Sequence, residues 1–147
     1  MDYIRYLREM IGSKQAIFVA AVVLIRDRSG RLLLQRRGDD GTWGVVGGIM
    51  NLGETVEEAA RREVREETGL EVGELALFDV FTGEHVYPGG NQAVTVSVVY
   101  TSDDVSGSPV ADGEESLELR YFALDALPEP IFPPNVEMLS VVKKRLG

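Results

Sequence analysis

Two boundary signals enclose one segment of the chain and specify a helix between them. Thr55 and Glu58 form a T-x-x-E capping box, which predicts that the helix begins at Thr55. Gly69 follows Thr68 and can end the helix in the left-handed conformation that glycine adopts easily. The spacing predicts a helix of about 14 residues, and the rest of the chain must pack around it.

The predicted helix has an apolar face bordered by carboxylates. At about 100° per residue, Val56, Ala60 and Val64 fall on one side and can pack on a sheet. Three glutamates lie beside that face, within an arc of about 100°: Glu63, Glu66 and Glu67. None has a lysine or arginine three or four residues later, so their charges are unfavourable unless a cation neutralises them. Ligands made only of carboxylate oxygens select hard divalent ions such as Mg²⁺ or Mn²⁺.

A second interpretation treats the segment as a solvated helix held by ion pairs. Glu57 with Arg61, and Glu58 with Arg62, have the four-residue spacing that such pairs need. This structural interpretation predicts no affinity for metal. It leaves the glutamates near the end of the helix without partners.

The composition narrows the possible functions. Apolar residues make up 44% and charged residues 27% of the chain, as in a soluble globular domain. The net charge of −9 argues against a protein that grips a nucleic-acid backbone, although metal ions can supply the charge needed to bind a phosphorylated small molecule. The absence of cysteine excludes disulfides, thiolate nucleophiles and cysteine-based zinc sites, and His85 is the only histidine.

Strands are predicted on both sides of the central helix. The apolar runs at 16–27 and 31–37 are predicted to pair, with a turn at Ser29 and Gly30. Further strands are predicted at 74–84, 93–102 and 117–124. Two more helices are predicted at 1–12 and 135–146. Asn135 is the expected N-cap of the last helix.

Together these elements predict one mixed α/β (α+β) domain over residues 1–147. No segment is apolar enough to cross a bilayer and no secretion signal is recognisable, which favours the cytoplasm. The sequence is compatible with a monomer or a homodimer. No binding to membranes or to bulk nucleic acid is expected.

The central segment resembles a known signature. From Gly48 to Leu70 it reads G-x5-E-x7-R-E-V-x-E-E-x-G-L, which is similar at every defined position to the box of the Nudix hydrolases. The box covers 23 residues, and the flanking strand pattern is similar to that of the family over most of the chain.

The resemblance implies a Nudix-like αβα sandwich with a mixed sheet and a loop-helix-loop catalytic element. It implies a hydrolase that cleaves a pyrophosphate bond in a nucleoside diphosphate linked to another moiety, with Mg²⁺ as cofactor and Mn²⁺ as an alternative. The substrate would be a nucleotide-derived small molecule such as ADP-ribose, a dinucleoside polyphosphate, a nucleotide sugar or a nucleoside triphosphate.

By the same resemblance, each residue of the box has an expected role. The expected metal ligands are Glu63, Glu66 and Glu67, joined by Glu54 directly or through water and by the carbonyl of Gly48. Either Glu63 or Glu66 also orients or deprotonates the attacking water. Arg62 is expected to hold the catalytic glutamates rather than the phosphate, and its alternative is a surface pair with Glu58.

The sequence departs from the family's common pattern at two positions outside the defined box. Val46 stands where many members have proline, and Asn51 where many have glutamate. The missing carboxylate at Asn51 would weaken one metal site, but the core constellation is complete and activity is still expected. A further acid often assists from outside the box. Among the acids that precede the last strand, Glu115 is the candidate, and an exposed acidic loop is the alternative.

Four aromatic or imidazole side chains are candidate substrate contacts: Trp43, Phe81, His85 and Tyr87. Ordinary packing is the alternative for each of them. Tyr87 resembles a feature of dinucleoside polyphosphate hydrolases and Pro88 one of ADP-ribose hydrolases, although a turn explains both residues.

Two related functions compete with the hydrolase. An isopentenyl diphosphate isomerase of this family would need a catalytic cysteine, which the chain lacks. A noncatalytic nucleotide-sensing module would usually show an eroded box, whereas Glu63, Glu66 and Glu67 are all present.

Overall fold

The computed structural model describes residues 2–147, so the first residue of the helix predicted at 1–12 lies outside the described residues. Three α-helices form close to the predicted positions: α1 Tyr3–Ile11, α2 Val56–Thr68 and α3 Val136–Leu146. A short 3-10 turn, η1 Pro133–Asn135, leads into α3. No helix within residues 2–147 has the length and apolar character needed to span a bilayer.

The largest sheet is mixed and has the order β4-β1-β7-β6. Its strands are β1 Ala16–Ile25, β4 Val46–Ile49, β6 Ala76–Val86 and β7 Gln92–Ser102. β1 runs parallel to β7 and antiparallel to β4, and β6 is antiparallel to β7. A second sheet has the order β3-β2-β9, and a short pair joins β5 to β8. These strands are β2 Leu32–Arg37, β3 Trp43–Gly44, β5 Glu71–Val72, β8 Val105–Ser106 and β9 Ser116–Phe122.

The predicted pairing of β1 with β2 is wrong, although the turn between them is correct. Gly30 has φ 79°, and its N–H donates to the carbonyl of Asp27 at 2.9 Å. Only one bridge, Arg26 to Leu32, joins the two segments before they enter different sheets. The reason is burial: β1 is apolar on both faces, so it takes the centre of a sheet between β4 and β7.

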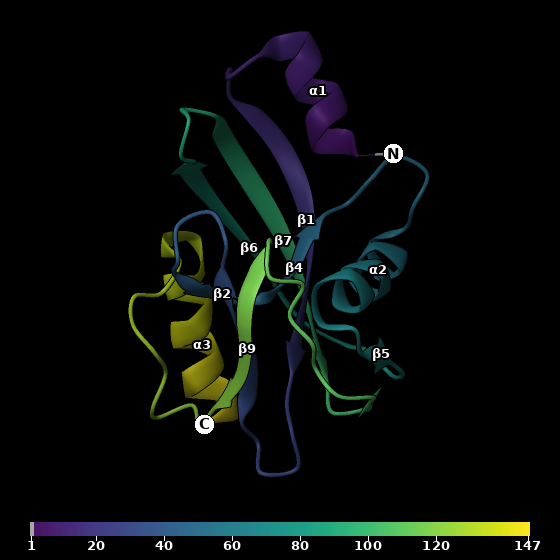
Figure 1. The fold of residues 1–147 in the computed structure, drawn as a ribbon, viewed down its shortest axis with the longest axis vertical. Helices are drawn as coiled ribbons and strands as arrows, with labels where there is room; N and C mark the ends of the chain where they lie inside the picture. The colour runs from purple at the N-terminus through teal and green to yellow at the C-terminus, as the bar shows by residue number, and fades with distance from the viewer. Residues whose placement is uncertain (1) are drawn as a thin grey trace.

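Helices cover the two sides of the strands, which confirms the αβα sandwich (Figure 1). On one side, Ala60 and Val64 of α2 pack against Val23 of β1. On the other side, α3 packs against Val22 and the neighbouring apolar side chains. Because successive side chains of β1 point to opposite faces, this one strand supplies both cores.

The start of α3 differs from the prediction in one respect. Asn135 occupies the N-cap position, but its side chain makes no capping hydrogen bond. Its Oδ1 instead accepts the N–H of Val45 at 3.1 Å, in a buried position 90 residues away in sequence. The position of the N-cap was therefore predicted correctly, but the role of the side chain was not. Asn135 joins α3 to Val45, which precedes β4.

Candidate active site

The helix α2 begins and ends as the sequence predicts. Thr55 Oγ1 accepts the N–H of Glu58 at 3.1 Å, and Glu58 Oε1 accepts the N–H of Thr55 at 3.0 Å. Gly69 ends the helix with φ 74°, in the left-handed region. Because the carboxylate of Glu58 is used in the capping box, the predicted pair between Glu58 and Arg62 is wrong. The pair of Glu57 with Arg61 is present, at 3.4 Å.

The three glutamates beside the apolar face differ in exposure. Glu67 is 6% exposed, and its Oε1 accepts from Gln35 Nε2 at 2.8 Å and from the Gly47 N–H at 3.0 Å. The side chain of Glu63 is 13% exposed and that of Glu66 is 55% exposed. α2 therefore presents one carboxylate in the core, one at its edge and one facing solvent.

Burial raises the pKa of the two inner carboxyls. Burial, then the nearby charge of Glu63, raises the pKa of Glu67 well above its usual range. Burial also raises the pKa of Glu63, and the adjacent Arg62 opposes that shift. Two carboxyls held together out of water favour a bound cation, because a cation removes the cost of ionising both.

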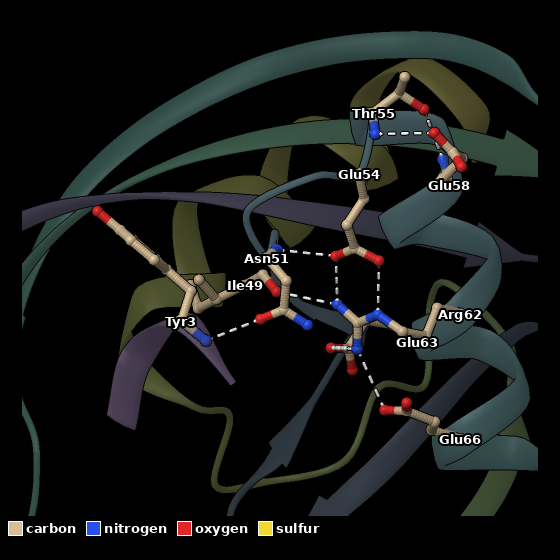
Figure 2. Close-up of polar contacts among 9 residues, drawn as sticks. All are labelled: Tyr3, Ile49, Asn51, Glu54, Thr55, Glu58, Arg62, Glu63 and Glu66. Carbon is tan, nitrogen blue, oxygen red and sulfur yellow. Dashed lines mark hydrogen bonds and ion pairs between the residues drawn. The ribbon is translucent and has the colours of Figure 1, made fainter. Parts of the chain in front are cut away.

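Arg62 lies at the centre of the polar network shown in Figure 2. Its guanidinium binds Glu54 through two hydrogen bonds, of 2.8 Å from Nε and 2.7 Å from Nη2. Nη1 donates to Glu63 at 2.8 Å and to Glu66 at 3.2 Å, and Nη2 also donates to the carbonyl of Ile49 at 3.1 Å. The bond to Glu54, ahead of the other contacts, raises the pKa of Arg62, and Arg62 lowers the pKa of Glu54.

Gly48 lies where a side chain would collide with the carboxylate of Glu63. A Cβ on Gly48 would be 2.5 Å from Glu63 Cδ and 2.6 Å from each carboxylate oxygen. These distances are far below normal van der Waals contact. Glycine at this position therefore allows β4 to approach the carboxylate, with its backbone beside the expected ligands.

The side chains fit a hard divalent cation by their chemistry. Glu54, Glu63, Glu66 and Glu67 offer only oxygen donors, which Mg²⁺ and Mn²⁺ prefer. Within residues 2–147, no three acidic or histidine side chains already surround a common metal position. Arg62 bonds to three of these carboxylates, so its guanidinium provides the local positive charge.

A cleft of about 950 Å³ opens beside the carboxylates. Strands β1, β6 and β7 contribute Ala20, Phe81 and Thr95 to its lining, and α2 contributes Glu63 and Glu66. This arrangement places an extended pocket directly against the acidic face of α2.

One region of the cleft is aromatic. The rings of His85 and Phe132 have their centroids 5.2 Å apart, and those of His85 and Tyr87 are 4.6 Å apart. Arg37 lies over the face of Phe132 at 3.7 Å, and its guanidinium is held by Asp39 through bonds of 3.0 and 2.8 Å. His85 and Tyr87 therefore offer ring surface to a ligand. Phe132 is only 5% exposed and supports them, and the charge of Arg37 is paired with Asp39.

Three of the four predicted substrate contacts line the cleft, and the fourth is buried in the core. Phe81, His85 and Tyr87 line the cleft, as does Glu115. Trp43 is 7% exposed and packs edge-to-face on Phe122 in the core, so the packing alternative describes it.

Sequence reasoning gave no role in the site to several residues that line the cleft, among them Gln35, Arg37, Phe132 and Asn135. For Gln35, polarity within an apolar strand was an available signal, because a buried amide needs partners. Phe132 carried no comparable signal, since its place depends on the fold of the loop before α3.

Comparisons with known proteins give one family. A family model for the NUDIX domain matches residues 17–141. The chain is 34% identical to an ADP-ribose pyrophosphatase of Methanocaldococcus jannaschii over 76% of this chain and 66% of that protein. It is 28% identical to the NAD-capped RNA hydrolase NudC of Vibrio vulnificus over 88% of this chain and 47% of that protein. The chain thus spans less than two thirds of the length of these relatives.

A solved structure supports the same grouping. The crystal structure of a MutT NUDIX hydrolase from Burkholderia pseudomallei superposes with a TM-score of 0.74 and 29% identity. The match covers 90% of this chain and 99% of that chain.

Proposed function

The chain belongs to the NUDIX family, and from that premise we propose that it is a metal-dependent pyrophosphohydrolase. Its substrate is a nucleoside diphosphate linked to another moiety. The observation that carries the proposal is the acidic edge of α2, where Glu63 and Glu66 face a large cleft and Arg62 binds both.

The metal is Mg²⁺, with Mn²⁺ as an alternative, and Glu63, Glu66 and Glu67 would hold it. Glu54 and the carbonyl of Gly48 complete the expected ligand set. When bound, such an ion neutralises phosphate oxygens and lowers the pKa of a coordinated water.

The protein's own side chains divide the remaining work. Glu66 accepts a proton from the attacking water, because it is the most exposed of the three glutamates and its one hydrogen bond from Arg62 is 3.2 Å long. Arg62 orients Glu63 and Glu66 while Glu54 holds the guanidinium. Gln35 and the Gly47 N–H fix the buried carboxyl of Glu67.

The aromatic region of the cleft receives the nucleoside or the group joined to its diphosphate. His85 and Tyr87 supply ring surface, and the buried Phe132 supports them. Arg37, held by Asp39, lies over Phe132. The name of the archaeal relative, an ADP-ribose pyrophosphatase, makes ADP-ribose the first substrate to test.

The test is hydrolysis of a panel with Mg²⁺ present: ADP-ribose, dinucleoside polyphosphates, nucleotide sugars and nucleoside triphosphates, followed by chromatography. Glu66→Gln is the test variant. Glu57→Gln is the matched control, because Glu57 is similarly exposed on the same helix and pairs with Arg61 rather than with Arg62. Cleavage that Glu66→Gln loses and Glu57→Gln keeps supports the proposal.

Two other outcomes contradict it. Binding of a nucleotide without cleavage by the wild type would indicate a sensing module. Failure to bind Mg²⁺ even with nucleotide present would indicate that α2 is a solvated helix held by ion pairs and not a metal site.

A further inference from the structure

The helix α1 lies outside the residues that match the family, yet it borders the same cleft. The match begins at residue 17, whereas α1 covers Tyr3–Ile11. Asp2 and Ile4 line the cleft together with Glu63 and Glu66. No residue of α1 is fully buried, so the helix lies at the edge of the hydrophobic core, where Tyr3 packs on the buried Phe18.

One hydrogen bond joins α1 to the loop before α2. The backbone N–H of Tyr3 donates to Asn51 Oδ1 at 2.9 Å, across 48 residues of sequence, in a partly buried position. The ring of Tyr3 also meets Phe18 edge-on, with centroids 6.2 Å apart. These contacts place the first turn of α1 over the chain that leaves β4 (Figure 2).

Asn51 connects this contact to the charged network. Its own backbone N–H donates to Glu54 Oε1 at 2.7 Å. The same oxygen accepts from Arg62 Nη2 at 2.7 Å, and Arg62 Nη1 donates to Glu63 at 2.8 Å. A continuous series of hydrogen bonds and one arginine thus runs from α1 to a carboxylate on the cleft (Figure 2).

We propose that α1 is a positioning element for the hydrolytic site and that Asn51 is the positioning residue through which it acts. The bond from Tyr3 fixes the Asn51 side chain, and with it the loop that aims Glu54 at Arg62. This inference rests on the proposed hydrolase function. It assigns a role to a segment outside the matched domain.

The fold offers a substitution that removes this bond selectively. Tyr3 is the first residue of α1, a position where proline is tolerated because its N–H has no partner within the helix. Asp2 has φ −86° and ψ 103°, which lie outside the helical region that proline disfavours for the residue before it. Tyr3→Pro deletes the N–H donor, and Tyr3→Ala keeps the donor while losing the same ring.

The experiment compares these two full-length variants, with Asn51→Ala and the double variant Tyr3→Pro with Asn51→Ala. We expect Tyr3→Pro to lower kcat about three- to tenfold relative to Tyr3→Ala. This is about the factor by which the loss of one neutral hydrogen bond changes an equilibrium constant. The Mg²⁺ concentration for half-maximal activity should rise and KM for the nucleotide should stay unchanged. The double variant should be no worse than Asn51→Ala.

Equal kcat and Mg²⁺ dependence in Tyr3→Pro and Tyr3→Ala would overturn the proposal, as would additive effects in the double variant. If the wild type cleaves nothing, the proposed function fails, and Mn²⁺ binding by calorimetry then decides the positioning role. Weaker Mn²⁺ binding in Tyr3→Pro than in Tyr3→Ala supports that role. Equal binding, or none in the wild type, refutes it.

Discussion

Replacing Arg62 with alanine should destabilise the metal-free protein more than any other single charge removal on α2. The side chain of Arg62 is 22% exposed, and those of Glu54 and Glu63 are 15% and 13% exposed. In Arg62→Ala, two largely buried carboxylates lose their shared cation, and water reaches them only in part.

The size of the effect follows from this burial. Removing one partner of a buried ion pair costs about 3 to 5 kcal/mol. Because these groups keep some contact with water, we expect the lower end, about 3 kcal/mol. For a chain of this size, that loss corresponds to a fall in Tm of about 6 to 12 °C.

The assay is urea unfolding of wild type and Arg62→Ala at neutral pH with EDTA. Arg65→Ala is the matched control, since Arg65 on the same helix pairs with Glu71 at 2.9 Å while both side chains are more than half exposed. Such a surface pair contributes at most about 1 kcal/mol. If Arg62→Ala loses no more stability than Arg65→Ala, the reasoning about the buried network is refuted.

Three other perturbations follow from the site. Gly48→Ala should lower activity about 100-fold in steady-state assays, because its Cβ displaces the carboxylate of Glu63. Glu67→Gln should flatten the pH dependence of stability in EDTA above the ordinary glutamate pKa of 4.5. The raised pKa of Glu67 means that stability is greatest below the pKa of the unfolded state and falls as pH rises toward the folded pKa. Asn135→Ala should cost about 1 to 3 kcal/mol in urea unfolding, because the buried N–H of Val45 loses its acceptor.

Two of these have a control variant within the chain. Gly83→Ala adds a methyl group to the lining of the same cleft, but its Cβ meets nothing within 4 Å, so it should lose far less activity than Gly48→Ala. Asn135→Asp keeps an oxygen acceptor and should recover part of the stability lost in Asn135→Ala. Parallel pH profiles for Glu67→Gln and wild type would show that the buried carboxyl is not the group responsible. An active Gly48→Ala would mean that Glu63 can move without consequence.

Local rules account for the parts of the fold that were predicted well. The capping box of Thr55 with Glu58 and the left-handed Gly69 involve residues close in sequence, so the bounds of α2 follow from the sequence alone. The helical period then places Ala60 and Val64 in the core. For the same reason the glutamates beside that face could be recognised before the fold was known.

Strand pairing is not a local property, and there the prediction was wrong. β1 and β2 are neighbours in sequence, but burial on both faces of β1 draws it between β4 and β7. The pairing partners of β1 depend on which distant strands can cover its two edges. The spacing of residues within β1 carries no information about those partners.

The sequence by itself determined the helix α2, the order of its carboxylates and the family to which the chain belongs. Only the tertiary structure decided that Arg62 binds Glu54 rather than Glu58, and that Asn135 reaches Val45 rather than capping α3. It also brought Tyr3 beside Asn51 and placed Trp43 in the core. Helix signals act within a few residues along the chain, whereas these contacts require the packing of segments far apart in sequence.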